Sequence, residues 1–456
     1  MKFFSSGVCS AHLFQVSALR LGLTGLLAAL GLQAGVAAAQ AQAAPEKEWD
    51  ARMQASWIWQ SKPASSARYS GPNSLSVSRE TGYTFSSTAY LGWKPAAGLE
   101  FWFNPELVQG VPLSNLTGLG GMSNGEQQKV SGPNPTLYRA RIFMRRTWSL
   151  AGEAEQIEPE ANQFALATTR RRFVLTAGNL AVTDIFDDNA YAHDARTQFM
   201  NWSFLTHGAF DFAADARGYS WGVAGEYYHD DWVFRAGRFM QPAESNGLPL
   251  DRRLLRYYGD QLEIEHAHSM SGLPGKARLL LFRNRARMGS FDEALQRAPA
   301  GVAPVLSTVR RDQSKVGAGV ALEQALGADA GVFARGSWND GGAETYAFTE
   351  IDRSATGGVE IKGRSWGRAE DRLGAAIAVN GISSAHRRYL AAGGLGAFLG
   401  DGALNYGTER IAELYYSMRL AKSTWFSIDW QRIVNPGYNR DRSPVSVASV
   451  RLHFEL

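Results

Sequence analysis

Apolar side chains recur at every second position of residues 314–339, which is the pattern of a β-strand with one apolar and one polar face. The pattern breaks briefly at Gly327–Asp329 and then resumes, as expected for a hairpin. Each arm is about ten residues long, which is long for a strand of a soluble protein and suits a tilted strand that crosses a bilayer. The first arm has Val316, Ala318, Val320 and Leu322 on its apolar face.

The same module recurs along the chain and gives sixteen strand candidates, an even number. Their connections alternate between long and short, which is typical of a barrel with short periplasmic turns and long extracellular loops. The sequence therefore predicts a single domain over residues 49–456, an all-β, transmembrane, antiparallel up-and-down β-barrel of 16 strands. The candidates are 49–60, 80–93, 99–105, 138–149, 171–180, 219–228, 232–240, 257–268, 276–285, the two arms of 314–339, 356–363, 371–380, 408–420, 424–433 and 444–456.

Composition agrees with this prediction but does not establish it. The mean hydropathy of −0.24 excludes a helical membrane protein. The 48 glycines and 11% aromatic residues suit a barrel with a wet lumen and aromatic belts at the membrane interfaces. A soluble β-sandwich shares such a composition. The prediction of a membrane barrel therefore depends on the alternation of long and short connections.

Residues 1–39 have the pattern of a signal peptide, with Lys2 and Arg20 before an apolar run at 21–32 and small residues at 35–39. We expect cleavage at about residues 39–41. The alternative is a membrane anchor, but the apolar run is too short. The processed chain would lack the sole cysteine, Cys9, and so could form neither a disulfide nor a thiolate zinc site. It would keep 45 basic and 43 acidic residues, a balance that gives no indication of nucleic-acid binding.

Several segments resemble the carbohydrate-selective outer-membrane porins, the OprB family. The resemblance covers most of the chain after the signal peptide and is densest between residues 69 and 242. It implies a sixteen-stranded barrel that passes sugars in the bacterial outer membrane, and it does not specify which sugar. The segments are YSGPNSL at 69–75, EFWFNPELVQG at 100–110, GLGGMSNGEQQK at 118–129, YRARIFMRR at 138–146, DIFDDNAYAHDARTQFMNW at 184–202 and HGAFDFAADARGYSWGVAGE at 207–226.

Charged residues on the polar strand faces are the candidates for the solute path. Arg139, Arg141 and Arg145 are spaced by two and four, so we expect them to share one face. Facing lipid, each would cost about 2–4 kcal/mol near the midplane, so we predict that they face the lumen. Two interpretations remain open, a role in solute selectivity and an ion-pair network that only keeps the lumen hydrated. Acidic residues on the inferred inner faces are Glu263, Glu265, Glu409, Glu413, Asp429 and Glu455.

Loop and aromatic residues add to this path. Tyr90 is on a polar strand face and could stack on sugar rings. The loop at 179–202 carries Asp187 and Arg196, and we predict that it folds into the lumen as a constriction; the alternative is a loop stabilised by its own Asp–Arg bonds. We expect no metal, since EF-hand spacing is absent and His266 and His268 lack a third ligand. We expect no cofactor, since Gly118–Gly125 does not continue as a phosphate loop.

The favoured function is a passive, gradient-driven channel of the outer membrane for carbohydrates, in particular monosaccharides such as glucose. The alternatives are a general or anion-preferring diffusion porin and, from another class, a barrel adhesin or enzyme. No G-x-S-x-G motif occurs, and we identify no catalytic residue. The expected partners are sugar solutes, outer-membrane lipid and the barrel-assembly machinery, for which the amphipathic strand 444–456 is a signal that ends in Leu456. The assembly state is left open between a monomer and a homo-oligomer.

Overall fold

The computed structural model describes residues 47–130 and 132–456, so the expected signal peptide lies outside the described residues. Sixteen strands form one closed antiparallel barrel, in which β1 pairs with β18 from Gln54↔Glu455 to Ser61↔Ala448. The fold expected from the sequence is confirmed. The barrel strands are β1 (Trp49–Lys62), β2 (Glu80–Ala96), β3 (Leu99–Val111), β4 (Gly132–Ser149), β7 (Arg172–Leu180), β8 (Ser220–His229), β9 (Trp232–Met240), β10 (Tyr258–Met270), β11 (Leu273–Met288), β12 (Arg311–Ala325), β13 (Ala330–Asn339), β14 (Arg353–Gly363), β15 (Arg368–Gly381), β16 (Glu409–Ala421), β17 (Thr424–Val434) and β18 (Val445–Glu455).

The two faces of the wall follow the alternation in the sequence. On β12, Val316, Val320 and Leu322 expose 43%, 53% and 51% of their surface on the outside of the barrel. Lys315 and Glu323 on the same strand are buried inside it. An apolar outer face and a polar inner face are what a barrel in lipid requires.

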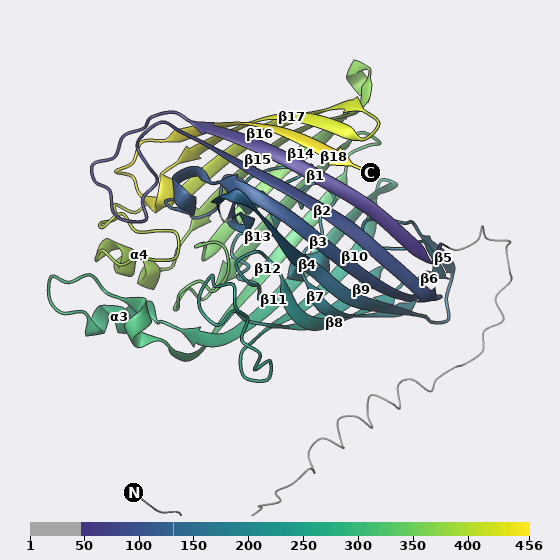
Figure 1. The fold of residues 1–456 in the computed structure, drawn as a ribbon, viewed down its shortest axis with the longest axis horizontal. Helices are drawn as coiled ribbons and strands as arrows, with labels where there is room; N and C mark the ends of the chain where they lie inside the picture. The colour runs from purple at the N-terminus through teal and green to yellow at the C-terminus, as the bar shows by residue number, and fades with distance from the viewer. Residues whose placement is uncertain (1–46, 131) are drawn as a thin grey trace, which may run out of the picture. The chain divides into compact units, whose positions relative to one another are not determined.

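The connections are sorted between the two ends of the barrel. Turns such as 230–231, 271–272 and 422–423 join strands at one end, whereas the long loops lie at the other (Figure 1). None of the helices in the described residues is long and apolar enough to cross a membrane. The helical segments are η1 (Leu113–Leu116), η2 (Gln127–Lys129), η3 (Val182–Asp184), α2 (Trp202–Leu205), α3 (Phe291–Arg297), η4 (Leu306–Val309), η5 (Arg364–Trp366), α4 (Ser384–Ala391) and η6 (Pro436–Tyr438).

One connection at the short-turn end is long. Residues 150–171 join β4 to β7 and contain a small hairpin of β5 (Ala154–Ile157) and β6 (Leu166–Thr169), which Figure 1 shows at the end opposite α3 and α4. The side chain of Arg145 donates a hydrogen bond to the carbonyl oxygen of Asn162 at 2.8 Å, and Phe164 packs on Trp102 with ring centroids 5.0 Å apart. This connection therefore reaches into the lumen from the periplasmic end.

The wall predicts a position-dependent cost for arginine on its outer face. Val320→Arg places a charge in the apolar band and should lower the free energy of unfolding from lipid vesicles by about 2–4 kcal/mol, because lipid cannot solvate it. Thr81→Arg, at the extracellular end of β2, should cost only about 0–1 kcal/mol, since the headgroups are close. Denaturant titration of the protein folded into vesicles measures both. Equal costs at the two positions would contradict the orientation of the wall.

Candidate solute pathway through the barrel

The long loop between β7 and β8, residues 181–219, folds into the lumen and is hydrogen-bonded to the wall. The Glu413 carboxylate on β16 accepts the backbone N–H of Asn201 at 2.9 Å. The Arg451 guanidinium on β18 donates to the carbonyl oxygens of Ala195 and Gln198 at 2.7 and 2.8 Å. Polar and ionisable wall residues thus satisfy backbone groups of an irregular segment that is buried inside the barrel, which is the condition for such a segment at membrane depth.

Asp187 is a further attachment point of this loop. It is fully buried, pairs with Arg335 of β13 at 3.0 Å and accepts hydrogen bonds from the Thr206 hydroxyl and the His207 backbone N–H, both at 2.7 Å. Burial alone would raise the pKa of Asp187, but the charges of Arg335 and His207 and the hydrogen bonds lower it to about 2. Asp187 therefore stays ionised and fixes the loop.

A second loop between β3 and β4, described over residues 112–130, also reaches inside. The Glu409 carboxylate on β16 accepts the backbone N–H groups of Gly120 at 3.1 Å and Gly437 at 2.8 Å, so one side chain joins two loops. A Cβ atom on Gly120 would lie 2.3 Å from the Tyr438 hydroxyl, so only glycine fits this approach. Together the two loops cover the inner wall on the β13–β18 side.

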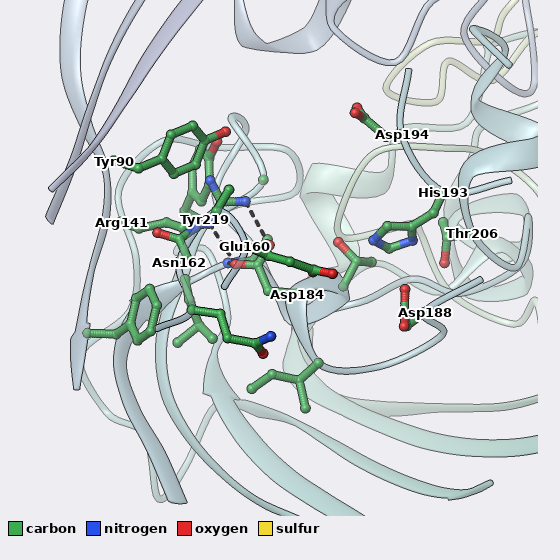
Figure 2. A pocket seen from close by; sticks show the side chains of 18 of the residues that line it. Tyr90, Arg141, Glu160, Asn162, Asp184, Asp188, His193, Asp194, Thr206 and Tyr219 are labelled. Carbon is green, nitrogen blue, oxygen red and sulfur yellow. Dashed lines mark hydrogen bonds and ion pairs between the residues drawn. The ribbon is translucent and has the colours of Figure 1, made fainter. Parts of the chain in front are cut away.

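An open cavity of about 810 Å³ remains on the other side of the lumen. Its wall residues come from β1–β4 and β7–β11, and residues 160–164 line it from the periplasmic connection. Figure 2 shows Tyr90, Arg141 and Asn162 on one side of it and His193, Thr206 and Asp188 on the other. The cavity is the candidate solute path. Its charged lining is Lys129, Arg141, Arg145, Arg172, Arg196, Arg217, Arg235 and Lys276 with Glu100, Glu106, Glu126, Glu160, Asp184, Asp188, Asp194, Glu226 and Glu265.

A buried cluster narrows the path where the two loops meet. The Arg196 guanidinium lies 2.9 Å from the Glu106 carboxylate of β3 and 2.8 Å from that of Glu126, and it donates to the Thr88 hydroxyl at 2.8 Å. Lys129 lies 3.1 Å from Glu126. Burial would lower the pKa of Arg196, yet Glu126 and Glu106 keep it well above its usual value. The guanidinium group of Arg196 in this cluster is thus charged and fixed in position by its carboxylate partners.

A second cluster lies beside it on the wall. The Arg141 guanidinium forms a two-bond ion pair with Asp184, 2.7 Å for each bond, and stacks over the Tyr219 ring with its carbon 5.1 Å from the ring centroid. Burial would raise the pKa of Asp184, but the charge of Arg141 lowers it. Tyr90 accepts a hydrogen bond from the Gln54 side chain and lines the same cavity. Aromatic rings and fixed charges therefore face the same space.

The structure corrects the prediction for Arg139, which faces outward. Asn104 pairs with Arg141 and Pro105 pairs with Arg139, so Ala140 is an extra residue that shifts the alternation by one. Arg139 is consequently exposed and stacks over Trp221 on the outer face, 5.2 Å from its centroid. Pro105 has no N–H for the ladder, and this is the local reason for the bulge.

The other candidates divide into two groups. Tyr90, Arg141, Arg145, Arg196 and Glu265 line the cavity. The second group is buried elsewhere, because the inserted loops cover these side chains or because they pair with wall residues; the prediction that they line the path was wrong. This group is Glu263, Glu409, Glu413, Asp429 and Asp187.

Sequence reasoning missed Glu106, Glu126, Lys129 and Tyr219. All four lie in segments that carry the family resemblance, at 100–110, 118–129 and 207–226, so a signal for them was present. Within residues 47–130 and 132–456, no group of three or more His, Cys, Asp or Glu side chains could bind a metal ion.

A closed barrel with an apolar outer face, a polar inner path and inserted loops defines an outer-membrane porin. The chain belongs to the carbohydrate-selective porin family OprB, which matches residues 73–456. It is therefore a carbohydrate diffusion channel of the bacterial outer membrane.

One solved structure shows the same fold, and two further matches are weaker. The high-pH structure of Pseudomonas putida OprB has a TM-score of 0.67 at 16% identity and covers 90% of this chain and 94% of that one. The low-pH structure of the same protein has a TM-score of 0.48 at 12% identity, covering 89% and 93%. Pseudomonas aeruginosa OccK2 (OpdF) has 0.45 at 10% identity, covering 90% and 98%. No curated protein sequence matches the chain.

The attachment of the inserted loop predicts a change in conductance. Arg451→Met removes the donor for the carbonyl groups of residues 195, 197 and 198, so the loop should loosen and the single-channel conductance should rise with added noise. The matched control is Arg432→Met, because Arg432 is exposed on the outer face of the neighbouring strand β17. Planar-bilayer recordings measure both. Unchanged conductance in Arg451→Met would mean that the loop is fixed without this side chain.

Proposed function

We propose that neutral monosaccharides such as glucose are the preferred solutes. The observation that carries the proposal is the charge balance of the cavity, which has eight Lys and Arg side chains against nine Asp and Glu side chains. A balanced lining gives no strong preference for either sign of ion, whereas its fixed donors and acceptors can replace the water around sugar hydroxyls. The volume of about 810 Å³ is within the range of about 300–1,000 Å³ typical of small-molecule sites.

Within this proposal, particular residues set the selectivity. Arg141, Arg145 and Arg196 offer guanidinium donors, and Glu265 offers an acceptor. The ring of Tyr90 faces the same cavity and could pack on the C–H groups of a sugar. Because the arginines are already paired, they change position little when a solute passes, so each contact is weak and release is fast.

A general or anion-preferring porin is the second candidate. Arg217 supports it, because this cavity residue makes no ion pair in the described part of the chain and stacks over Tyr138, 4.6 Å from the centroid. Such an unpaired, half-buried cation in the path would attract anions. The fold and family indicate a channel rather than an enzyme.

We propose two further features of the biogenesis of the channel. Residues 1–39 direct export and are removed, and the barrel-assembly machinery binds the amphipathic strand β18. Outer-membrane lipid surrounds the apolar face, and a homo-oligomer is proposed as the alternative to a monomer. Mass determination of the purified protein tests both the cleavage and the assembly state.

Swelling of proteoliposomes tests the solute preference. Vesicles should swell faster in glucose than in an isosmotic disaccharide, because the path is narrow, and faster than in a singly charged sugar acid, because the lining is balanced. Vesicles without protein are the control. Faster entry of the sugar acid than of glucose would favour the anion-preferring alternative, and no swelling in any sugar would contradict the proposal.

A charge reversal tests the role of the lining. Arg141→Glu removes a cation beside Asp184 and adds an anion, so the reversal potential in a salt gradient should shift toward cation preference. Arg139→Glu makes the same change two residues away but on the outer face, and its reversal potential should stay close to that of the wild type. Equal shifts in the two variants would contradict the assignment of the faces.

A further inference from the structure

The outer surface of the barrel carries arginines just beyond its apolar band. On β11, Leu279 and Leu281 are exposed to lipid, and the next outward positions toward the extracellular end are Arg283, Arg285 and Arg287. The residues between them are buried inside the wall. Three successive outward positions span about 13 Å along a strand, since each residue adds about 3.3 Å.

Neighbouring elements extend this row into a patch. The Arg238 guanidinium of β9 lies 2.6 Å from the Asp260 carboxylate and stacks on Tyr258, 3.9 Å from the centroid. Register places Asp260 opposite Arg283 and Tyr258 opposite Arg285. The same face therefore continues over β9, β10 and β11.

The extracellular loop after β9 adds two more guanidinium groups. Arg253 and Arg256 stack over Tyr257 at 4.7 and 5.2 Å, and Arg256 lies 3.0 Å from Asp312 of β12. Asp312 pairs in register with Arg287. We call this set the outer arginine patch; it consists of Arg238, Arg253, Arg256, Arg283, Arg285 and Arg287.

The patch has an excess of positive charge. Its six arginines face three carboxylates, those of Asp251, Asp260 and Asp312, and each carboxylate is bound to an arginine. Arg283 and Arg287 form no ion pair within residues 47–130 and 132–456. Stacking on tyrosine limits the motion of the Arg238, Arg253 and Arg256 guanidinium groups, so these donors are arranged before any ligand arrives.

The depth of the outer arginine patch in the membrane indicates which part of a lipid it contacts. Lipid-facing arginine costs about 2–4 kcal/mol at the midplane and about 0–1 kcal/mol near the interfaces, so these arginines belong at the headgroup level. The short turn 271–272 lies at the periplasmic end of β11, so the arginines at its other end lie on the extracellular side. Further outward arginines near the extracellular strand ends are Arg139, Arg353, Arg410 and Arg432.

We propose that the outer arginine patch binds the phosphate-bearing headgroup of a lipid in the outer leaflet. Guanidinium groups bind phosphate with two parallel hydrogen bonds, and the leucines below the patch lie where the acyl chains of the same lipid would run. A second copy of the chain fits less well, since a two-fold contact would place the patch against its own positive charge. The lipid fills the apolar and the charged part of the site together.

Lipid retention by the folded full chain tests the proposal. Native mass spectrometry would compare a bisphosphorylated glycolipid with its dephosphorylated counterpart, and we expect at least about tenfold tighter retention of the phosphorylated form, decreasing with salt. The double variant Arg285→Gln with Arg287→Gln should lose most of this preference. The matched control is Arg146→Gln, since Arg146 stacks over Trp148 near the periplasmic end of β4 and should not matter.

Other outcomes would overturn the proposal. These are equal retention of the two lipids by the wild type, an unchanged preference in the double variant, or a dimer that depends on these arginines and not on lipid. The phosphate group could come from a lipid headgroup or from free phosphate in solution. Binding of inorganic phosphate alone distinguishes the two, because a site for the free anion would bind inorganic phosphate as tightly as it binds the lipid. The comparison of the two lipids needs no variant, so it decides the matter even where the double variant does not fold.

Discussion

The absence of water in the bilayer core is the constraint on which the structure depends. Every backbone N–H and C=O group in lipid must find a hydrogen-bond partner inside the protein. A β-sheet can therefore cross the bilayer only when it closes into a barrel. Pairing of β1 with β18 provides that closure. Closure in turn forces one face of every strand toward lipid and the other toward a wet lumen. The apolar and polar alternation of the chain is the chemical consequence.

A wet lumen allows irregular backbone at membrane depth. The loop at 181–219 is acceptable there because wall side chains satisfy its backbone groups, with Glu413 accepting N–H groups and Arg451 donating to carbonyl oxygens. Glu409 does the same for two other loops. These buried side chains are therefore structural, and the wide barrel becomes a narrow path along the side formed by β1–β4 and β7–β11.

The sequence predicts the strands well because a period of two is a local property. It cannot place the loops, since Glu413 and Asn201 are far apart in the chain and only the fold brings them together. The small hairpin β5–β6 is missed because each strand has four residues, too few to show a period. Arg139 is assigned to the wrong face because a bulge opposite Pro105 breaks the alternation that the argument assumes.

Arginine has two different roles on the inner and the outer face of the barrel wall. Inside, Arg196 lies between Glu106 and Glu126, so its charge is compensated and its hydrogen-bonding geometry is fixed. Outside, Arg283 and Arg287 lack such compensation in the described residues and lie at the level where anionic headgroups occur. Compensated charge suits neutral, hydroxyl-rich solutes, because it offers hydrogen bonds without retaining counter-ions. Uncompensated charge suits a ligand that brings its own negative charge, and a membrane leaflet with phosphate groups supplies one.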